Sequence, residues 1–221
     1  MPAESHPTTS GPSESRPTES RAAESLPAES RYAASRIELE QCVQVFDGAL
    51  TPEFCTQMID SFNQVPQLHV PNGRGLVAGL EGSAWTELNL MPLLHPGLKG
   101  FFFQQIDEYL ARYNRNMPMQ MPVPSRPTIE DIRIKRYRAG TDEKFEPHYD
   151  AANKMCNRYL VFLWYLNDVA AGGETEFADL GLRVQARTGR LLMFPPYWMF
   201  QHAGLPPVSH DKYIVSTYLM F

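Results

Sequence analysis

The chain has 221 residues, 43% of them hydrophobic, and a formal net charge of −5 at pH 7. That length allows one full domain with a sizeable core and some additional chain. The acidic balance disfavours nucleic acid as the main partner, because a negatively charged surface does not attract a polyanion. No run of about 18 apolar residues occurs, so we expect no membrane partner.

The cysteines, Cys42, Cys55 and Cys156, are odd in number and lack the close spacing of a metal site. Such a set disfavours a disulfide framework and favours small buried thiols in a reducing compartment. The N-terminus also lacks the apolar core of a signal peptide. We therefore expect a cytoplasmic protein.

Residues 1–36 consist mainly of Ser, Glu, Pro, Ala and Arg, and the pair Glu-Ser recurs at positions 4–5, 14–15, 19–20, 24–25 and 29–30. Apolar side chains are too few here to offset the entropy lost on ordering the chain. We predict a disordered low-complexity tail over 1–36, with a role as a tether as the alternative, and one ordered domain over 37–221.

The first half of this domain is predicted to contain two helices. After a short strand at residues 44–46, a helix is expected from Thr51-Pro52, an N-cap and first-turn proline, to about Asn63. Glycines predict a loop over Pro71–Ser83 that covers the mouth of a site. A second helix follows over about Leu98–Tyr113, and prolines predict an extended loop over Met117–Pro127.

From Ile129 onward the pattern is typical of strands. Ile132 and Ile134 alternate with charged residues, and a near-continuous apolar run follows at Tyr159–Leu166. Further strands are expected at Leu182–Ala186, Leu191–Phe194 and Tyr213–Tyr218. Short strands separated by turns predict a mainly β sandwich or jelly roll, with the two helices packed outside it in an α+β arrangement.

His148 and Asp150 are the first candidates for chemistry. Residues two apart in a strand face the same side, so this imidazole and this carboxylate can point into one cavity. His202, after several predicted strands, could complete the two-histidine, one-carboxylate set that non-haem iron(II) oxygenases use. Taken singly, each of the three could equally be an ordinary surface or buried side chain.

Lys212 lies ten residues after His202, at the start of the last predicted strand. A deeply placed cation is costly unless it meets an anion, and the far carboxylate of 2-oxoglutarate would be such an anion. A solvated surface lysine is the alternative.

These motifs occur in the order of a known family: Arg136–Gly140, Pro147–Ala151, Tyr159–Asn167, Gly172–Phe177, Gly189–Phe194, His202, Pro207-Val208 and Lys212-Tyr213. The chain resembles the iron(II)/2-oxoglutarate-dependent oxygenase superfamily, nearest the catalytic domain of prolyl 4-hydroxylases. The resemblance is good over Ile132–Leu219. One departure is Asp211, which replaces the usual glycine before the lysine.

The resemblance implies a double-stranded β-helix, iron(II) at His148, Asp150 and His202, and 2-oxoglutarate held by Lys212. It also implies that Tyr137 and Thr175 line the cosubstrate pocket, although core packing and strand filling would explain them equally well. O2 is then the oxidant, succinate and carbon dioxide are released, and ascorbate stays open as an additional cofactor.

The substrate is less determined than the chemistry. The resemblance favours hydroxylation of a prolyl or other peptidyl residue. Hydroxylation of a free amino acid or another small molecule is the alternative within the enzyme class. A catalytically silent jelly-roll binding protein is the alternative outside it, and iron-dependent succinate production would separate the two classes.

Deleting residues 1–36 tests the predicted boundary. We expect the melting temperature to stay unchanged, because the segment has too little apolar surface to pack against the domain. Thermal unfolding of the full chain and of residues 37–221 measures this, and a clear drop on truncation would show that the tail is part of the fold.

Overall fold

The computed structural model describes residues 37–76, 78–125 and 128–221. The predicted tail lies outside these residues. Two helices, α2 (Pro52–Gln64) and α3 (Pro96–Asn116), accompany the strands. The strands are β1 (Gln44–Phe46), β2 (Val70–Gly73), β3 (Ala84–Asn89), β4 (Thr128–Ile129), β5 (Arg133–Tyr137), β6 (Phe145–His148), β7 (Arg158–Tyr165), β8 (Thr175–Phe177), β9 (Leu182–Val184), β10 (Leu191–Phe194), β11 (His202–Gly204) and β12 (Lys212–Met220).

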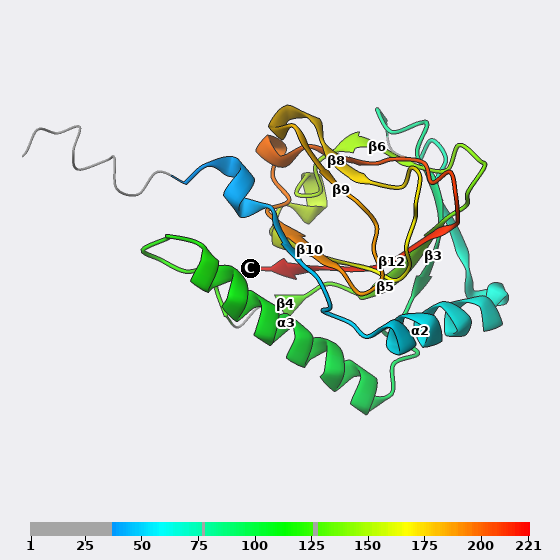
Figure 1. Cartoon of the computed structure of the whole chain (residues 1–221), viewed down its shortest axis with the longest axis horizontal. Helices are drawn as coiled ribbons and strands as arrows, with labels where there is room; N and C mark the ends of the chain where they lie inside the picture. The colour runs from blue at the N-terminus through cyan, green and yellow to red at the C-terminus, as the bar shows by residue number, and fades with distance from the viewer. Residues whose placement is uncertain (1–36, 77, 126–127) are drawn as a thin grey trace, which may run out of the picture. The chain divides into compact units, whose positions relative to one another are not determined.

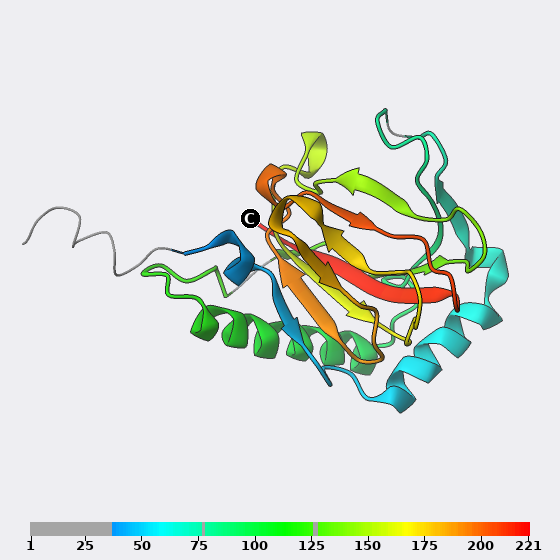
Figure 2. The same cartoon turned by 45° about the horizontal axis from the view of Figure 1, so that its top comes forward.

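The strands form two sheets that face each other (Figures 1 and 2). The larger has the order β1-β10-β7-β12-β5-β3-β2, with β4 paired to β12, and the smaller has the order β6-β11-β8-β9. Every pairing within them is antiparallel. This is the mainly β, double-stranded β-helix that the sequence predicts.

The central strand β7 shows how the layers are separated. All eight of its residues are buried. Phe162 and Trp164 belong to a core cluster shared with the helices, whereas Val161, Leu163 and Tyr165 belong to a cluster between the two sheets. A strand covered on both faces needs such a continuous apolar run, and β7 has one because helices cover one side and the second sheet the other.

Both helices lie against the outer face of the larger sheet (Figure 2). The predicted apolar face of α3 is buried, as expected: Phe102, Ile106, Leu110 and Tyr113. The helix is longer than predicted because it begins with an unusual cap, His95, whose Nδ1 accepts a hydrogen bond from the Leu98 amide over 3.2 Å. Helix α2 begins at its predicted cap, Thr51.

Two predictions in the first half need correction. The loop predicted over Pro71–Ser83 begins too early, because Val70–Gly73 pairs with Ala84–Asn89 as a hairpin of two unpredicted strands. β2 is an edge strand, where a proline costs no ladder hydrogen bond, so Pro71 was a misleading loop signal. The cysteines are not uniformly buried either: Cys55 is buried, Cys42 half-buried and Cys156 exposed.

Tight turns connect the strands around the sheets. Gly189 has a φ of +75°, and a Cβ there would lie 2.1 Å from the Leu50 carbonyl oxygen, so only glycine fits this close approach. Across the part of the chain that the structure describes, no helix has the length and apolar character needed to span a membrane.

Candidate metal and cosubstrate site

Two neighbouring strands of the smaller sheet carry the candidate histidines. His148 is the last residue of β6 and His202 the first of β11, and they are direct cross-strand partners. Asp150 lies two residues beyond the end of β6, not within a strand as the spacing argument assumed. Its amide and that of Ala151 both donate to the Pro196 carbonyl, at 3.0 and 2.9 Å, which turns the chain and still brings the carboxylate to the histidines.

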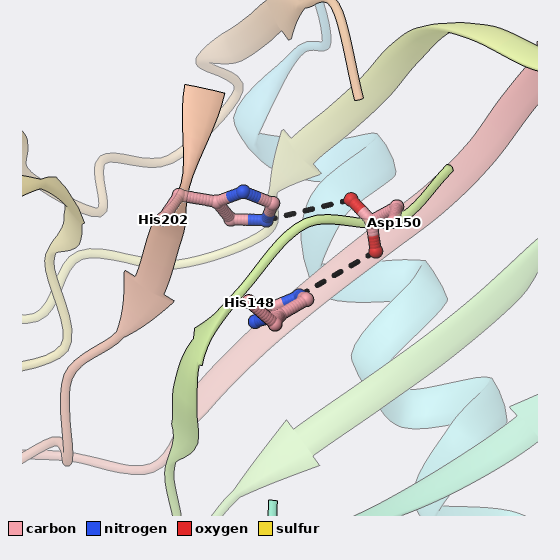
Figure 3. A group of neighbouring side chains, drawn as sticks. All are labelled: His148, Asp150 and His202. Carbon is pink, nitrogen blue, oxygen red and sulfur yellow. Dashed lines mark ion pairs between the residues drawn. The ribbon is translucent and has the colours of Figure 1, made fainter. Parts of the chain in front are cut away.

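The three side chains converge on one point (Figure 3). His148 Nε2 is 3.4 Å from Asp150 Oδ1, and His202 Nε2 is 3.5 Å from Asp150 Oδ2. One ligand atom from each residue lies within 4.8 Å of the others. His148 Nε2 and Asp150 Oδ2 are buried and have no hydrogen-bond partner among the described residues. Buried polar atoms rarely stay unpaired, so this pair fits a metal ion.

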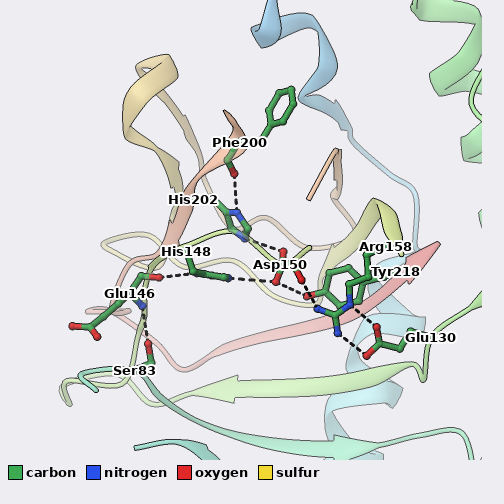
Figure 4. A network of polar contacts seen from close by, with 9 residues as sticks. All are labelled: Ser83, Glu130, Glu146, His148, Asp150, Arg158, Phe200, His202 and Tyr218. Atoms are coloured by element: carbon green, nitrogen blue, oxygen red, sulfur yellow. Dashed lines mark hydrogen bonds and ion pairs between the residues drawn. The ribbon is translucent and has the colours of Figure 1, made fainter. Parts of the chain in front are cut away.

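The remaining ring nitrogens fix the tautomers. His148 Nδ1 lies 2.7 Å from the Glu146 carbonyl oxygen and His202 Nδ1 lies 3.2 Å from that of Phe200 (Figure 4). Because a carbonyl only accepts, each Nδ1 carries the proton and each Nε2 presents a lone pair to the centre. Burial lowers the pKa of His202 to about 4, so this ring is neutral at pH 7, as a metal ligand must be.

The Asp150 carboxylate is kept ionised. Burial raises the pKa of this carboxyl, whereas its contacts with His148 and His202 and the positive charge of Lys135 lower it, and the balance lies well below the usual value. The site therefore offers two imidazole nitrogens and one charged carboxylate oxygen, the donor set suited to iron(II).

A chain of polar contacts holds Asp150 from outside the triad (Figure 4). Tyr218 donates from its hydroxyl to Asp150 Oδ1 over 2.9 Å. Arg158 donates to the Asp150 backbone oxygen over 3.2 Å and lies 3.7 Å from the Tyr218 ring centroid. Glu130 completes the chain by accepting two 2.6 Å hydrogen bonds from Arg158. Oδ1 is thus partnered, while Oδ2 is left for the centre.

Lys212 lines the same pocket as the triad. It is only 2% exposed and makes no hydrogen bond or ion pair with any described residue. The rings of Tyr137 and Tyr165 lie 5.4 and 5.6 Å from its ammonium. Burial, opposed in part by the carboxylate of Glu174, lowers the pKa of Lys212 to about 7. An ammonium in this setting is stabilised by an anion entering the pocket.

Tyr137 and Thr175 also line this pocket. Tyr137 is the cross-strand partner of Lys212, and burial raises the pKa of its hydroxyl far above the usual value, so it stays a proton donor. Thr175 Oγ1 accepts a 2.7 Å hydrogen bond from the Tyr165 hydroxyl, which leaves the threonine proton free to donate. Both residues face the Lys212 end of the pocket.

Asp211, the departure before Lys212, has a structural role. Its Oδ1 accepts from the Ala139 amide over 2.8 Å, and its backbone oxygen accepts from the Asn167 side chain over 2.7 Å. These bonds tie the start of β12 to two neighbouring loops. The side chain thus secures the turn that a glycine would otherwise make.

Residues 132–220 match the model of the 2OG-Fe(II) oxygenase superfamily. Over this span the chain is similar to that superfamily. Among curated proteins, the chain is 28% identical over 111 residues to the human prolyl 4-hydroxylase subunit alpha-1, covering 42% of this chain and 20% of the relative. A putative prolyl 4-hydroxylase of Acanthamoeba polyphaga mimivirus is also 28% identical, over 47% of this chain and 49% of the relative. The chain spans about a fifth of the length of the first of these.

Solved structures share the fold. The viral collagen prolyl hydroxylase of Paramecium Bursaria Chlorella virus-1, solved as a 2OG complex, superposes with a TM-score of 0.61 at 21% identity over 80% of this chain and 95% of that one. A Trichoplax adhaerens prolyl hydroxylase, solved with a hypoxia inducible factor peptide fragment, gives 0.63 at 14% identity over 81% of this chain and 84% of that one. At these identities the likeness shows the fold alone.

Several residues at the site were not predicted from the sequence: Lys135, Phe145, Arg158, Tyr165, Ser216 and Tyr218. Tyr218 and Ser216 could have been predicted to face the pocket, since both lie an even number of residues from Lys212 and so on the same strand face. Arg158 could not have been predicted in this way, because its contact with Asp150 depends on the path of the chain after β6.

Tyr218→Phe tests the outer support of the carboxylate. Removing the hydroxyl leaves Asp150 Oδ1 without its partner, and loss of such a contact typically weakens metal affinity by about 10–100-fold. We expect weaker binding of Mn(II) or Fe(II) in titrations. Tyr213→Phe, on the opposite face of β12, is the matched control. Equal metal affinity in both variants would contradict the positioning role of Tyr218.

Proposed function

We propose that the protein is an iron(II)- and 2-oxoglutarate-dependent dioxygenase that hydroxylates an organic substrate. His148, Asp150 and His202 would hold the iron, and Lys212, with Tyr137 and Thr175 beside it, would hold the cosubstrate. The observation that carries this proposal is that unpartnered buried metal-ligand atoms and an unpartnered buried ammonium line one pocket.

When bound, iron(II), 2-oxoglutarate and O2 supply the oxidising chemistry, which consumes the cosubstrate to succinate and carbon dioxide. The protein supplies orientation. Lys212 would fix the far carboxylate by charge, and the Tyr137 and Thr175 hydroxyls would add hydrogen bonds to it. The triad, which lines the same pocket, would anchor the opposite end of the cosubstrate.

The rest of the pocket wall excludes water. Buried apolar residues from three central strands line it: Val161, Leu163, Phe194 and Ile214. A dry, low-dielectric wall strengthens the attraction between Lys212 and a carboxylate. It also protects a reactive centre from side reactions with solvent.

A prolyl or other peptidyl residue is the substrate that the relatives favour. The curated relatives are named as prolyl 4-hydroxylases, and one structural neighbour holds a peptide fragment. Succinate release from 2-oxoglutarate, measured with iron(II) and a library of proline-containing peptides, tests this proposal. No iron-dependent succinate with or without added peptide would overturn the enzymatic function.

Replacing the triad tests the metal assignment. His148→Ala, Asp150→Ala and His202→Ala should each abolish substrate-dependent succinate release, because each removes one of three protein ligands. The fold should persist, since the residues lie at the pocket and not in the core clusters. Circular dichroism checks the fold, and near-normal turnover in two of the three variants would sink the assignment.

Lys212→Ala tests the cosubstrate assignment. Losing one partner of a desolvated charge pair typically costs about 2–5 kcal/mol. We therefore expect the 2-oxoglutarate affinity to fall at least about tenfold, since about 1.4 kcal/mol is one decade. Metal affinity measured without 2-oxoglutarate should barely change. Lys212→Arg should be milder, and equal cosubstrate affinity in wild type and Lys212→Ala would refute the role.

The same assignment predicts a pH dependence. Lys212 has a pKa of about 7 before an anion binds, and only its protonated form attracts a carboxylate. The 2-oxoglutarate affinity should therefore be greatest below pH 7 and should decline as the pH rises above it. Titrations of metal-loaded protein between pH 6 and 9 measure this, and Lys212→Arg should flatten the decline because a guanidinium stays charged.

A further inference from the structure

A second buried lysine, Lys135, lines the pocket that the triad and Lys212 also line. Lys135 lies on β5, two residues before Tyr137, so both side chains point between the sheets. The residue is 8% exposed. It makes no hydrogen bond or ion pair with any other residue that the structure describes. Its close neighbours are instead aromatic rings, those of Trp85 at 5.5 Å and Phe145 at 5.9 Å.

A purely structural role for Lys135 would be an ion pair with Glu87, its cross-strand partner on β3. The Glu87 carboxylate is already engaged, however. One oxygen accepts from Trp85 Nε1 over 2.8 Å, and the other forms a 3.0 Å ion pair with Arg133. Arg133 is shared with Asp131, which lies 3.5 Å from another of its nitrogens, so both Arg133 and Lys135 act on Glu87. The ammonium of Lys135 is attracted to this carboxylate from a distance but is not paired with it.

The proposed cosubstrate complex does not neutralise Lys135 either. The two charges of 2-oxoglutarate and the one of Asp150 would be matched by iron(II) and Lys212. The additional ammonium of Lys135 is then offset only by carboxylates with which it forms no ion pair, chiefly that of Glu87. Burial lowers the pKa of Lys135, with the carboxylates of Glu87 and Asp150 opposing this only in part. Such a cation is costly to retain unless an anion meets it.

The position of Lys135 in the pocket indicates which kind of anion would meet its ammonium. Lys135 is the cross-strand partner of Ile214, one step along β12 from Lys212 toward Ser216 and the Asp150 end. The ring of Phe145, beside the ammonium, also stacks on His148 at a centroid distance of 3.5 Å and an angle of 15°. The carbon atoms attached to an anion at Lys135 would therefore lie next to a metal ligand, where the atom to be hydroxylated belongs.

We propose that Lys135 binds a carboxylate of the primary substrate and so selects substrates that carry an acid group close to the hydroxylated carbon. This inference rests on the proposed function. The carboxylate could come from the backbone of a free amino acid or from an acidic side chain of a peptide. Both sources offer the same group to the ammonium, and the aromatic walls of Trp85 and Phe145 would pack on the adjoining carbons.

Binding measurements on paired probes test this inference. The protein is loaded with Mn(II), which keeps the triad filled without turnover, and with 2-oxoglutarate. Free amino acids are compared with their carboxamides, and proline-containing peptides with Asp or Glu are compared with the same peptides with Asn or Gln. Quenching of tryptophan fluorescence reports binding, because Trp85 lies beside Lys135. The first set reports the free-acid source and the second the peptide source.

We expect at least one acid to bind at least about tenfold more tightly than its amide, and Lys135→Met to remove this preference. Lys99→Met, at an exposed position on α3, is the control and should keep it. The 2-oxoglutarate affinity of Lys135→Met should stay close to that of wild type. An equal affinity of every acid and its amide in wild type would overturn the proposal.

Two other outcomes would also overturn it, each in favour of a different role. If Lys135→Met weakened 2-oxoglutarate binding as strongly as Lys212→Ala, Lys135 would serve the cosubstrate. If Lys135→Met and Glu87→Gln both lowered the melting temperature clearly, Lys135 would be part of a structural pair. We expect instead an unchanged or higher melting temperature for Lys135→Met, because an unpaired buried charge is removed. Failure of wild type to bind Mn(II) or 2-oxoglutarate would instead overturn the proposed function itself.

Discussion

The desolvation of charge between the two sheets is the constraint on which the rest of the structure depends. Asp150, Lys135 and Lys212 are each at least nine-tenths buried, and among the described residues none of them forms a close ion pair with a carboxylate, lysine or arginine side chain; Asp150 lies beside the two imidazoles instead. Such groups stay charged only where fixed dipoles, rings or incoming ions compensate for lost water. The pocket is therefore built for charged occupants, and its aromatic and hydroxyl walls hold the protein charges in place until those occupants bind.

Strand alternation makes this pocket compatible with a stable core. On β12, Lys212, Ile214, Ser216 and Tyr218 face the pocket, whereas Val215 and Leu219 on the opposite face pack into the cluster shared with the helices. A slip of one residue would move the ammonium into the helix interface and the valine into the pocket. Apolar packing on the outer face thus fixes the register that functional residues on the inner face require.

Much of the fold followed from periodicity. The apolar run of β7 and the helical spacing of α3 each have a single low-energy arrangement, so Phe162 and Phe102 were placed correctly from sequence. β2 and β3 were not, because Pro71 and Gly73 suggest a loop and only the pairing with β5 stabilises this edge. At the site, the sequence grouped His148, Asp150, His202 and Lys212, but the reason given for Asp150 was wrong, since it lies after the end of β6, where the amides of Asp150 and Ala151 bond the Pro196 carbonyl. Lys135 could not be recognised, because a lysine in a half-buried strand is ordinary until its missing partner is seen.

β12 connects the two ends of the pocket. Its first residue, Lys212, faces the end lined by Thr175, and Tyr218, six residues later, holds Asp150 at the other end. Both ends of this strand are held by contacts outside the pocket. Asp211 bonds the Ala139 amide at the start. Near the end, the backbone of Glu130 forms hydrogen bonds with Thr217 and Tyr218. A shift of β12 would therefore displace Lys212 and Asp150 together. Glu130 also holds Arg158 against Asp150. The residue that fixes the end of β12 therefore also fixes Asp150, and this couples the two ends of the pocket.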